Sequence, residues 1–437
     1  MKLSKRLELL KEIKRDILTN ERTILKALKD DLNKCEFEGV ATEVQYVLSE
    51  IDHAIRKLAK WVKPKKVSTP LLHWPAKSYI HFEPYGEILI IGPWNYPFQL
   101  IFSPLVGALS AGNKVVIKPS EVSPHTSEVI NEILSQEKYR DIIKIVLGGV
   151  EQTTKLLERR FDYIFYTGST AVGKIIMQAA AKNLTPVTLE LGGKSPTVVT
   201  KFANLKIAAR RILWGKLMNA GQTCIAPDYI LIEESVKENF LREVKKEVAK
   251  LYGKDPSKSS DFGRIINSHH FDRLQKLIPE ECIVGGDYDS ETKYISPTIF
   301  ESELESKIMK DEIFGPLLPI ITFKDSEEAA EIIKDKEKPL AFYLFSENGS
   351  EVDYFKNEIT SGGMCINDTL IHAANGKLPF GGVGHSGIGS YHGHFSFETF
   401  SHKKSIVHRA NYLDIKLKYP PYFGKLKLVR WFLKFIG

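Results

Sequence analysis

Short apolar runs alternate with helical segments over much of the chain, and this pattern constrains the fold more than any other feature. GEILIIGP contains the apolar run 88–91 and stops at Gly-Pro, as a buried strand does. AGNKVVIKPSE, DIIKIVLGG, FDYIFYTGS and VTLELGG repeat this profile, with helix-like HTSEVINEILSQ and AVGKIIMQAAAK between them. Strands that alternate with helices about every 25 residues predict an α/β fold with a mostly parallel sheet. Ligands in such sheets bind beyond the carboxyl ends of the strands.

A second alternating region runs from about residue 196 to residue 395. It contains the helix-like VKENFLREVKKEVAKLY and the strand-like GPLLPIITF and PLAFYLF. Residues 1–62 are charged and helically periodic, which predicts helices packed on the surface. The Pro-bearing KPKKVSTPLLHWPAK then follows as a connection or an extended arm. A chain of 437 residues is long enough for two or three such domains.

Composition and charge indicate the cellular compartment of the protein and the kinds of partner that it can bind. The four cysteines (Cys35, Cys224, Cys282 and Cys365) are too scattered for a disulfide framework, which fits a reducing compartment. The N-terminal MKLSKRLELLKEIKRDIL predicts an amphipathic helix rather than a signal peptide, so we expect a cytoplasmic protein. A net charge of +7 is mild over this length and no nucleic-acid-binding motif is present, so no nucleic-acid partner is expected. The histidine spacing has no metal-site pattern, and no metal is expected.

Three polar residues stand in unusual surroundings. Cys224 lies in NAGQTCIAPD and is either a buried structural cysteine or a nucleophile in a loop. Glu190 ends the apolar VTLE, where desolvation would raise its pKa toward that of a general base, unless it is a surface residue before a turn. Asn95 in GPWNYPF could donate to a developing oxyanion or simply form an Asx turn.

The glycine-rich TGSTAVGK is ambiguous in the same way. Residues 168–174 satisfy GxxxxGK, but Ile175 stands where a phosphate-binding P-loop needs Ser or Thr. The dinucleotide fingerprint GxGxxG is also absent. What remains is a strand, a glycine turn and a helix N-terminus, which could bind a pyrophosphate or be an ordinary tight turn.

Seven segments taken in order resemble the aldehyde dehydrogenase superfamily over about residues 80–400. They are GPWNYPF, VVIKPSE, YTGSTAVGK, LELGGKSP, NAGQTCIAPD, EIFGPLLPI and LPFGGVGHSGIG. The resemblance implies an α/β aldehyde dehydrogenase fold of four parts. These are a Rossmann-like NAD(P)-binding domain (1–65 and 85–190), an α/β catalytic domain (191–394), a small bridging sheet for dimerisation (66–84 and 395–411), and a basic amphipathic tail (412–437).

The resemblance also implies a mechanism. Cys224 would attack the aldehyde carbonyl to form a thiohemiacetal, while the Asn95 amide and the Cys224 backbone N–H hold the oxyanion. Hydride transfer to the nicotinamide would leave a thioester, and Glu190 would activate the water that hydrolyses it. Glu190 is also the candidate to deprotonate Cys224.

The implied cofactor is NAD, with NADP possible. Seven residues would hold it: Lys118 and Glu121 at the adenosine ribose, Gly168, Ser169 and Gly173 at the pyrophosphate turn, and Glu312 and Phe314 at the nicotinamide ribose. Glu121 favours NAD because a carboxylate repels a 2′-phosphate.

Within the superfamily, YHGHFSFETFSHKKS resembles the class 3 signature. This implies a homodimer that oxidises medium- or long-chain aliphatic or aromatic aldehydes to carboxylic acids. Two alternatives stay open: a CoA-acylating enzyme, and a catalytically silent, membrane-associated relative.

The tail adds a further possibility. From Lys416 onward there are six basic residues and no acidic one. In KLKLVRWFLKFIG, helical spacing places Lys427, Arg430 and Lys434 on one face. The segment is too short to cross a bilayer. It could lie on an anionic lipid surface as a peripheral contact, dock on its own dimer, or be disordered.

Overall fold

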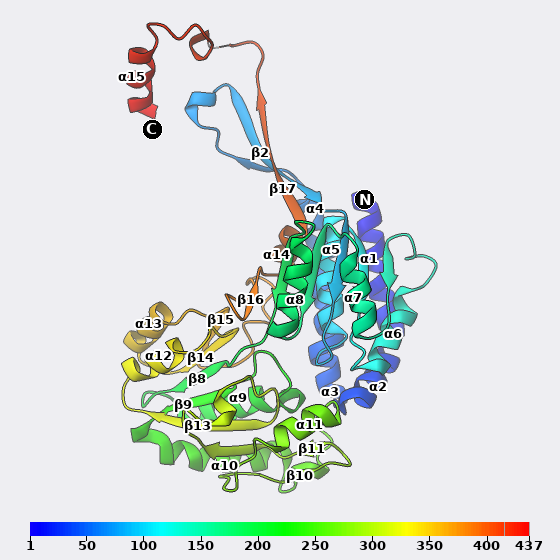
Figure 1. Cartoon of the computed structure of the whole chain (residues 1–437), viewed down its shortest axis with the longest axis vertical. Coiled ribbons are helices and arrows are strands. Elements are labelled where there is room, and N and C mark those ends of the chain that lie inside the picture. The colour runs from blue at the N-terminus through cyan, green and yellow to red at the C-terminus, as the bar shows by residue number, and fades with distance from the viewer. Residues whose placement is uncertain (415, 437) are drawn as a thin grey trace.

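A computed structural model describes residues 1–414 and 416–436, apart from the side chains of residues 72, 432, 435 and 436. The molecule contains two parallel sheets, each surrounded by helices, and an antiparallel arm that projects from one end (Figure 1). The fold is α/β, with Rossmann-like parallel sheets and a small antiparallel sheet.

The first sheet has six strands in the order β16-β7-β6-β3-β4-β5, and only β16 is antiparallel to its neighbour. Their bounds are Gly387–Ile388, Val187–Glu190, Tyr163–Thr167, Glu87–Ile91, Lys114–Lys118 and Ile143–Ile145. The apolar runs form strands because both faces are covered by helices, as continuous hydrophobic strands require. The surrounding helices are α5 (Gln99–Ala111), α6 (Pro124–Leu134), α7 (Val150–Glu158) and α8 (Thr170–Ala181).

The N-terminal residues supply α1 (Leu3–Thr19), α2 (Glu21–Leu32), α3 (Glu36–Glu38), the π-helix η1 (Gly39–Val44) and α4 (Gln45–Trp61). Residues 1–62 are therefore helical, as their periodicity predicts. The expectation that these helices only cover the surface is wrong for the segment between α2 and α4, because Lys34 and Glu43 are buried. Helix α5 is buried along its whole length, and it packs against α1, α4 and α14.

The second sheet has the order β12-β13-β9-β8-β14-β15 and is parallel throughout. Its strands are Thr298–Glu301, Leu317–Phe323, Tyr229–Glu233, Pro196–Val199, Ala341–Phe345 and Gly363–Ile366. Around it lie α9 (Leu205–Leu217), α10 (Lys237–Tyr252), α11 (Ser268–Gln275), α12 (Ser326–Lys334) and α13 (Gly349–Glu358). Shorter elements are η3 (Met218–Gly221), η4 (Glu234–Val236), η5 (Pro256–Lys258), η6 (Lys307–Met309) and the hairpin β10 (Tyr288–Asp289) and β11 (Tyr294–Ile295).

The arm is an antiparallel sheet of β1 (Lys65–Val67), β2 (Ala76–Pro84) and β17 (Ser401–Arg409), with η2 (Leu71–His73) between its first two strands. Beyond it lie η7 (Lys416–Lys418) and α15 (Leu426–Ile436), away from both parallel sheets (Figure 1). In the described part of the chain, no helix has both the length and the hydropathy that a membrane span requires.

Two elements depart from the expected domain ranges. Residues 395–399, expected in the arm, belong to helix α14 (Gly393–Thr399). The physical reason is aromatic packing: the Phe397 ring lies 5.3 Å from Phe82 and 5.8 Å from Trp61, which a strand leaving the body could not satisfy. Strand β16, expected in the catalytic domain, instead pairs with β7 at the edge of the first sheet.

Candidate active site

The two sheets meet through opposite ends of their strands. In the first sheet, Lys118 and Glu190 are the last residues of β4 and β7, while Asn95 and Gly168 follow β3 and β6. These strands are parallel neighbours, so their carboxyl ends share one edge. In the second sheet the order is reversed, because Cys224 precedes β9. The site therefore combines carboxyl ends of one sheet with amino ends of the other.

The loop before Cys224 is tightly wound. Asn219, Ala220 and Gly221 have φ values of 52°, 51° and 77°, three successive left-handed residues. A Cβ on Gly221 would lie 2.2 Å from the carbonyl oxygen of Gly315, so only glycine fits against that backbone. The loop is thereby pressed against the EIFGP segment.

Asn95 is fixed to this same loop. Its Nδ2 donates to the Gln222 carbonyl over 3.0 Å. Asn219 Nδ2 donates in turn to the carbonyl of Asn95 (2.9 Å) and to that of Gln222 (3.1 Å). An amide nitrogen carries two hydrogens, so Asn95 keeps one donor for another acceptor.

Glu190 is a buried carboxylate with no partner. It is 2% exposed, and neither of its carboxylate oxygens has a hydrogen-bond partner among the described residues. Burial raises the pKa of Glu190 well above its ordinary value because the charged form loses its hydration. A carboxyl group in this state is suited to accepting a proton.

The Cys224 thiol is partly exposed and held neutral. Burial of the sulfur raises the pKa of Cys224 above its usual range, and the nearby carboxylates of Glu312 and Glu190 raise it further. Both carboxyl groups therefore act electrostatically on the Cys224 thiol. A thiol in this environment needs a base before it can react.

Glu312 and Phe314 lie in the EIFGP segment between η6 and β13. Burial raises the pKa of Glu312 to about 8, with the charge of Asp228 as the next cause. A Cβ on Gly192 would lie 1.9 Å from Glu312 Oε2, so the carboxylate rests directly on that glycine. The ring of Phe314 packs edge-on against Trp94, with 5.3 Å between ring centres.

The remaining expected cofactor residues form a separate group at the carboxyl edge of the first sheet. Lys118 Nζ lies 3.0 Å from Glu121 Oε2, and the Glu121 side chain is 44% exposed, so it remains accessible to a ligand. Ser169 caps α8 by accepting a hydrogen bond from the backbone N–H of Val172. Gly168 N–H donates to the carbonyl oxygen of Glu190 over 3.0 Å.

Gly173 has a packing role in this structure. A Cβ there would lie 2.7 Å from Leu191 Cδ2, so a glycine lets α8 approach the chain that leaves β7. The carboxyl edge of the first sheet thus carries both the capped N-terminus of α8 and the Lys118–Glu121 pair. Positive dipole ends and ammonium groups suit pyrophosphate, and carboxylates suit ribose hydroxyls, so the donor set fits a dinucleotide.

Comparison with known proteins agrees with this geometry. Residues 1–406 match the model of the aldehyde dehydrogenase family. The chain belongs to the aldehyde dehydrogenase family. It is an NAD(P)-dependent aldehyde dehydrogenase of the class 3 type, and it oxidises aldehydes.

Its relatives cover nearly the whole chain. It is 47% identical to the 4,4'-diaponeurosporen-aldehyde dehydrogenase of Staphylococcus aureus, across 99% of this chain and 95% of that one. It is also 47% identical to the dimeric NADP-preferring aldehyde dehydrogenase of Canis lupus familiaris, across 96% and 94%. A solved structure described as the substrate-bound state of Staphylococcus aureus AldH superposes with a TM-score of 0.96 at 46% identity, covering 99% of this chain and 95% of that one.

Sequence reasoning missed several residues of this aldehyde dehydrogenase. Lys194 Nζ binds Asp228 at 2.5 Å and the carbonyls of Ile308 and Asp311 at 2.9 Å, which anchors the segment carrying Glu312. Lys216 is buried with no hydrogen-bond partner in the described structure, and burial lowers its pKa to about 8. Nothing in the local sequence distinguishes these lysines from surface lysines.

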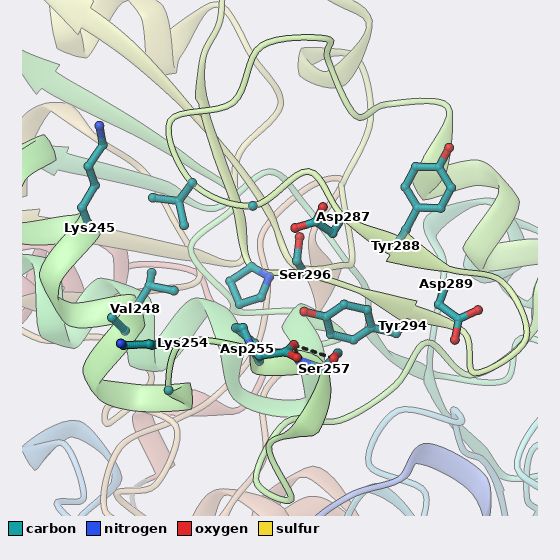
Figure 2. A pocket seen from close by; sticks show the side chains of 16 residues that line it. Lys245, Val248, Lys254, Asp255, Ser257, Asp287, Tyr288, Asp289, Tyr294 and Ser296 are labelled. Atoms are coloured by element: carbon teal, nitrogen blue, oxygen red, sulfur yellow. Dashed lines mark hydrogen bonds between the residues drawn. The ribbon is translucent and has the colours of Figure 1, made fainter.

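A separate hollow is lined by residues between positions 245 and 297 (Figure 2). It encloses about 560 Å³ between α10 and the β10–β11 hairpin, and Asp255, Asp287 and Tyr294 are among its walls. None of the expected catalytic or cofactor residues lines it. The described residues hold no cluster of three or more His, Cys, Asp or Glu side chains placed to bind a metal ion.

Proposed function

We propose that this enzyme oxidises an aldehyde to its carboxylic acid by covalent catalysis at Cys224. The observation that carries the proposal is the buried, unpartnered carboxyl group of Glu190, whose charge acts on the Cys224 thiol and raises its pKa. A thiol and a carboxyl group that interact electrostatically can exchange a proton when a substrate arrives, and the thiolate is then the nucleophile.

The chain's own residues account for the first bond change. Glu190 takes the proton of the Cys224 thiol, and the sulfur forms a bond to the carbonyl carbon. The electron pair of the carbonyl π-bond moves to oxygen. The free hydrogen of Asn95 Nδ2 and the backbone N–H of Cys224 stabilise this oxyanion.

When bound, NAD(P) supplies the acceptor for the hydride that leaves the substrate carbon. Lys118, Glu121 and the Gly168–Ser169 turn would bind its adenosine and pyrophosphate, and Glu312 its nicotinamide ribose. Glu190 releases the thiol proton to solvent and then takes a proton from water, whose oxygen bonds to the thioester carbon as the carbon–sulfur bond breaks; this second proton returns to the departing sulfur of Cys224. The products are the acid and free Cys224.

The test is reduction of NAD(P)⁺ by an aliphatic aldehyde in the absence of CoA. The wild type should show a burst followed by steady turnover, Cys224→Ser no activity, and Glu190→Gln a slower burst with little turnover. Reduction of NAD(P)⁺ that occurs only when CoA is added, with acyl-CoA as the product, would support a CoA-acylating enzyme instead. No reduction by the wild type would support a silent relative.

We infer medium- or long-chain aliphatic or aromatic aldehydes as substrates, because the class 3 relatives cover almost the whole chain. Both cofactors remain candidates: Glu121 disfavours the 2′-phosphate of NADP, while one relative is named NADP-preferring. A profile of kcat/KM against aldehyde chain length, measured with each cofactor, tests both points.

We further infer a homodimer bridged by the arm. Strand β17 is the outer strand of its sheet over nine residues, which leaves a row of backbone groups for a partner strand. One relative is named dimeric. Light scattering after size-exclusion chromatography should give twice the chain mass, and Val407→Pro on β17 should reduce it.

Peripheral contact with an anionic membrane is proposed for the tail. Phe423 is 99% exposed, and Leu426, Leu428 and Trp431 are more than half exposed, on a segment with basic residues and no acidic one. Co-sedimentation with anionic vesicles should fall when residues 422–437 are deleted. Unchanged partition would instead favour docking on the dimer.

A further inference from the structure

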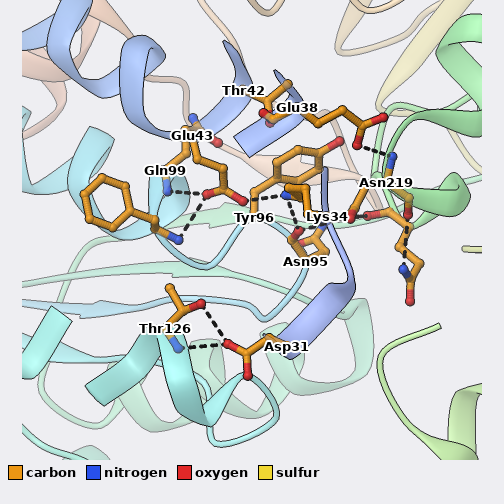
Figure 3. Close-up of polar contacts among 12 residues, drawn as sticks. Asp31, Lys34, Glu38, Thr42, Glu43, Asn95, Tyr96, Gln99, Thr126 and Asn219 are labelled. Carbon is orange, nitrogen blue, oxygen red and sulfur yellow. Dashed lines mark hydrogen bonds and ion pairs between the residues drawn. The ribbon is translucent and has the colours of Figure 1, made fainter. Parts of the chain in front are cut away.

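The segment that joins α2 to α4 carries buried charges that the mechanism above does not use. Lys34 Nζ lies 2.5 Å from Glu43 Oε1, and both side chains are 0% exposed. Glu38, between them in sequence, is half-buried, and burial raises its pKa to about 7. Figure 3 shows Lys34 and Glu43 beside Asn95 and Gln99, and Glu38 beside Asn219.

The Lys34–Glu43 pair holds both sides of the turn that presents Asn95. Lys34 Nζ donates to the Asn95 carbonyl over 3.3 Å, and the ammonium lies 4.0 Å from the centre of the Tyr96 ring. Glu43 Oε2 accepts the backbone N–H groups of Phe98 (3.1 Å) and Gln99 (2.8 Å). Since α5 begins at Gln99, the carboxylate caps the positive end of a buried helix.

The same segment also reaches the Cys224 loop. A Glu38 carboxylate oxygen accepts the backbone N–H of Asn219 over 3.0 Å, within the left-handed turn. The hydroxyl of Tyr96, beneath Lys34, lies 2.7 Å from the hydroxyl of Thr223, the residue before Cys224. Both donors of the oxyanion site, the Asn95 amide and the Cys224 N–H, are therefore tied to one segment.

Stability alone does not account for this arrangement. Two ions removed from water lose hydration that their attraction barely offsets, and apolar side chains of similar volume often stabilise a fold as well or better. What an ion pair adds is direction, because each hydrogen bond fixes an atom at a set distance and angle. A π-helix, the local form of η1 around Glu43, is frequent at functional sites.

We propose that Lys34, Glu38 and Glu43 are positioning residues that hold the two oxyanion donors at a fixed separation. The proposal rests on the oxyanion role given to Asn95 under the proposed function. It predicts that disturbing the segment slows formation of the covalent intermediate while leaving cofactor binding unchanged. The expected cofactor residues Lys118, Glu121 and Gly168 make their hydrogen bonds with residues outside this segment.

The test is a double-mutant cycle between this segment and Asn95. Lys34→Met combined with Glu43→Gln removes both charges together, so no buried ion is left unpaired. The readout is the pre-steady-state rate of NAD(P)H formation. In the wild-type background we expect a loss of about tenfold, less than the roughly 10²–10³-fold typical when an oxyanion donor is removed. In the Asn95→Ala background we expect a loss of less than about twofold.

Equal losses in both backgrounds would overturn the proposal, because they would show that the segment does not act through the Asn95 amide. The Kd of the cofactor and the thermal midpoint, measured on the same proteins, separate a positioning effect from partial unfolding. An unchanged rate for the Lys34→Met, Glu43→Gln protein would also overturn the proposal.

A second pair of variants keeps the proposal falsifiable if the double variant does not fold. Glu38→Asp shortens the side chain by one methylene and breaks its contact with the Asn219 N–H, whereas Glu38→Gln keeps an oxygen within reach. We expect about a fivefold slower burst for Glu38→Asp and recovery in Glu38→Gln. Equal rates for the two would contradict the positioning role.

The same variants distinguish a failure of the proposed oxyanion role from a failure of the positioning role alone. If Asn95→Ala reacts as fast as the wild type while Cys224→Ser is inactive, the oxyanion role is wrong and the positioning role falls with it. If Asn95→Ala is slow and the cycle is additive, only the positioning role is wrong.

Discussion

Replacing Gly221 by alanine should damage the catalytic loop more than the same change at a matched glycine. Gly221 has φ of 77°, and a Cβ there would lie 2.2 Å from the Gly315 carbonyl oxygen and 2.5 Å from its carbon. These are backbone atoms of a buried segment, so no rotamer change can relieve the contact. Gly253, after α10, has φ of 78° with nothing within 4 Å of its Cβ position.

The two sites differ in steric contact, and both carry conformational strain. Alanine at a positive φ costs about 1–3 kcal/mol, and the cost is at the upper end for Gly253 because its ψ of −171° belongs to a conformation that essentially only glycine adopts. Displacing well-packed neighbours adds about 1–3 kcal/mol, and this applies only to Gly221→Ala. We therefore expect Gly221→Ala to lower the free energy of unfolding by about 1–3 kcal/mol beyond its own conformational strain, and to slow the reaction at Cys224 where Gly253→Ala does not.

Urea unfolding followed by tryptophan fluorescence measures the stability difference, and the burst of NAD(P)H measures its consequence at Cys224. Gly253→Ala should keep the wild-type burst rate. Gly221→Ala should lose about tenfold or more, because a loop shift of about 1 Å moves the oxyanion donors. Equal stability losses in the two variants, with equal burst rates, would refute the reasoning.

Three further outcomes follow from the site. Burial raises the pKa of Glu190, and only its ionised carboxylate can take a proton from water, so thioester hydrolysis should accelerate as pH rises through that raised pKa; single-turnover rates should lose this slope in Glu190→Gln. Gly192→Ala should force Glu312 to rotate and raise the KM for NAD(P) about tenfold, with less than about 1 kcal/mol lost in stability because a side-chain end moves more easily than backbone. Glu121→Gln should lower the KM for NADP relative to NAD by about tenfold, checked by steady-state kinetics with both cofactors.

Much of the fold and of the candidate site is readable from local sequence. Apolar runs that stop at glycine or proline predict β3, β4, β6 and β7, because strands covered on both faces need continuous hydrophobic side chains. The parallel topology then places residues at adjacent strand ends on one edge, so Glu190 and Asn95 could be expected near each other. The resemblance to aldehyde dehydrogenases added Cys224 and the cofactor residues, whose roles remain predictions.

Other features depend on contacts between segments that are distant in sequence. Residues 395–399, including Phe397, are predicted to belong to the arm. Aromatic packing of Phe397 against Trp61 and Phe82 instead holds them in helix α14. The sequence predicts a loop around Cys224, but nothing in the local sequence shows that three left-handed residues lie before it. Gly221 needs its conformation because of Gly315, a residue more than ninety positions away.

The sequence by itself determined the strands, the helices and the order of the motifs, because hydrophobic periodicity and turn chemistry act over a few neighbouring residues. Only the tertiary structure decided that Lys34 and Glu43 are buried, since a charged residue in a helical segment ordinarily faces water. Lys34 meets the Asn95 carbonyl across 61 residues of chain. Burial and pKa are properties of all the atoms around a group, and those atoms come from segments that local pattern cannot bring together.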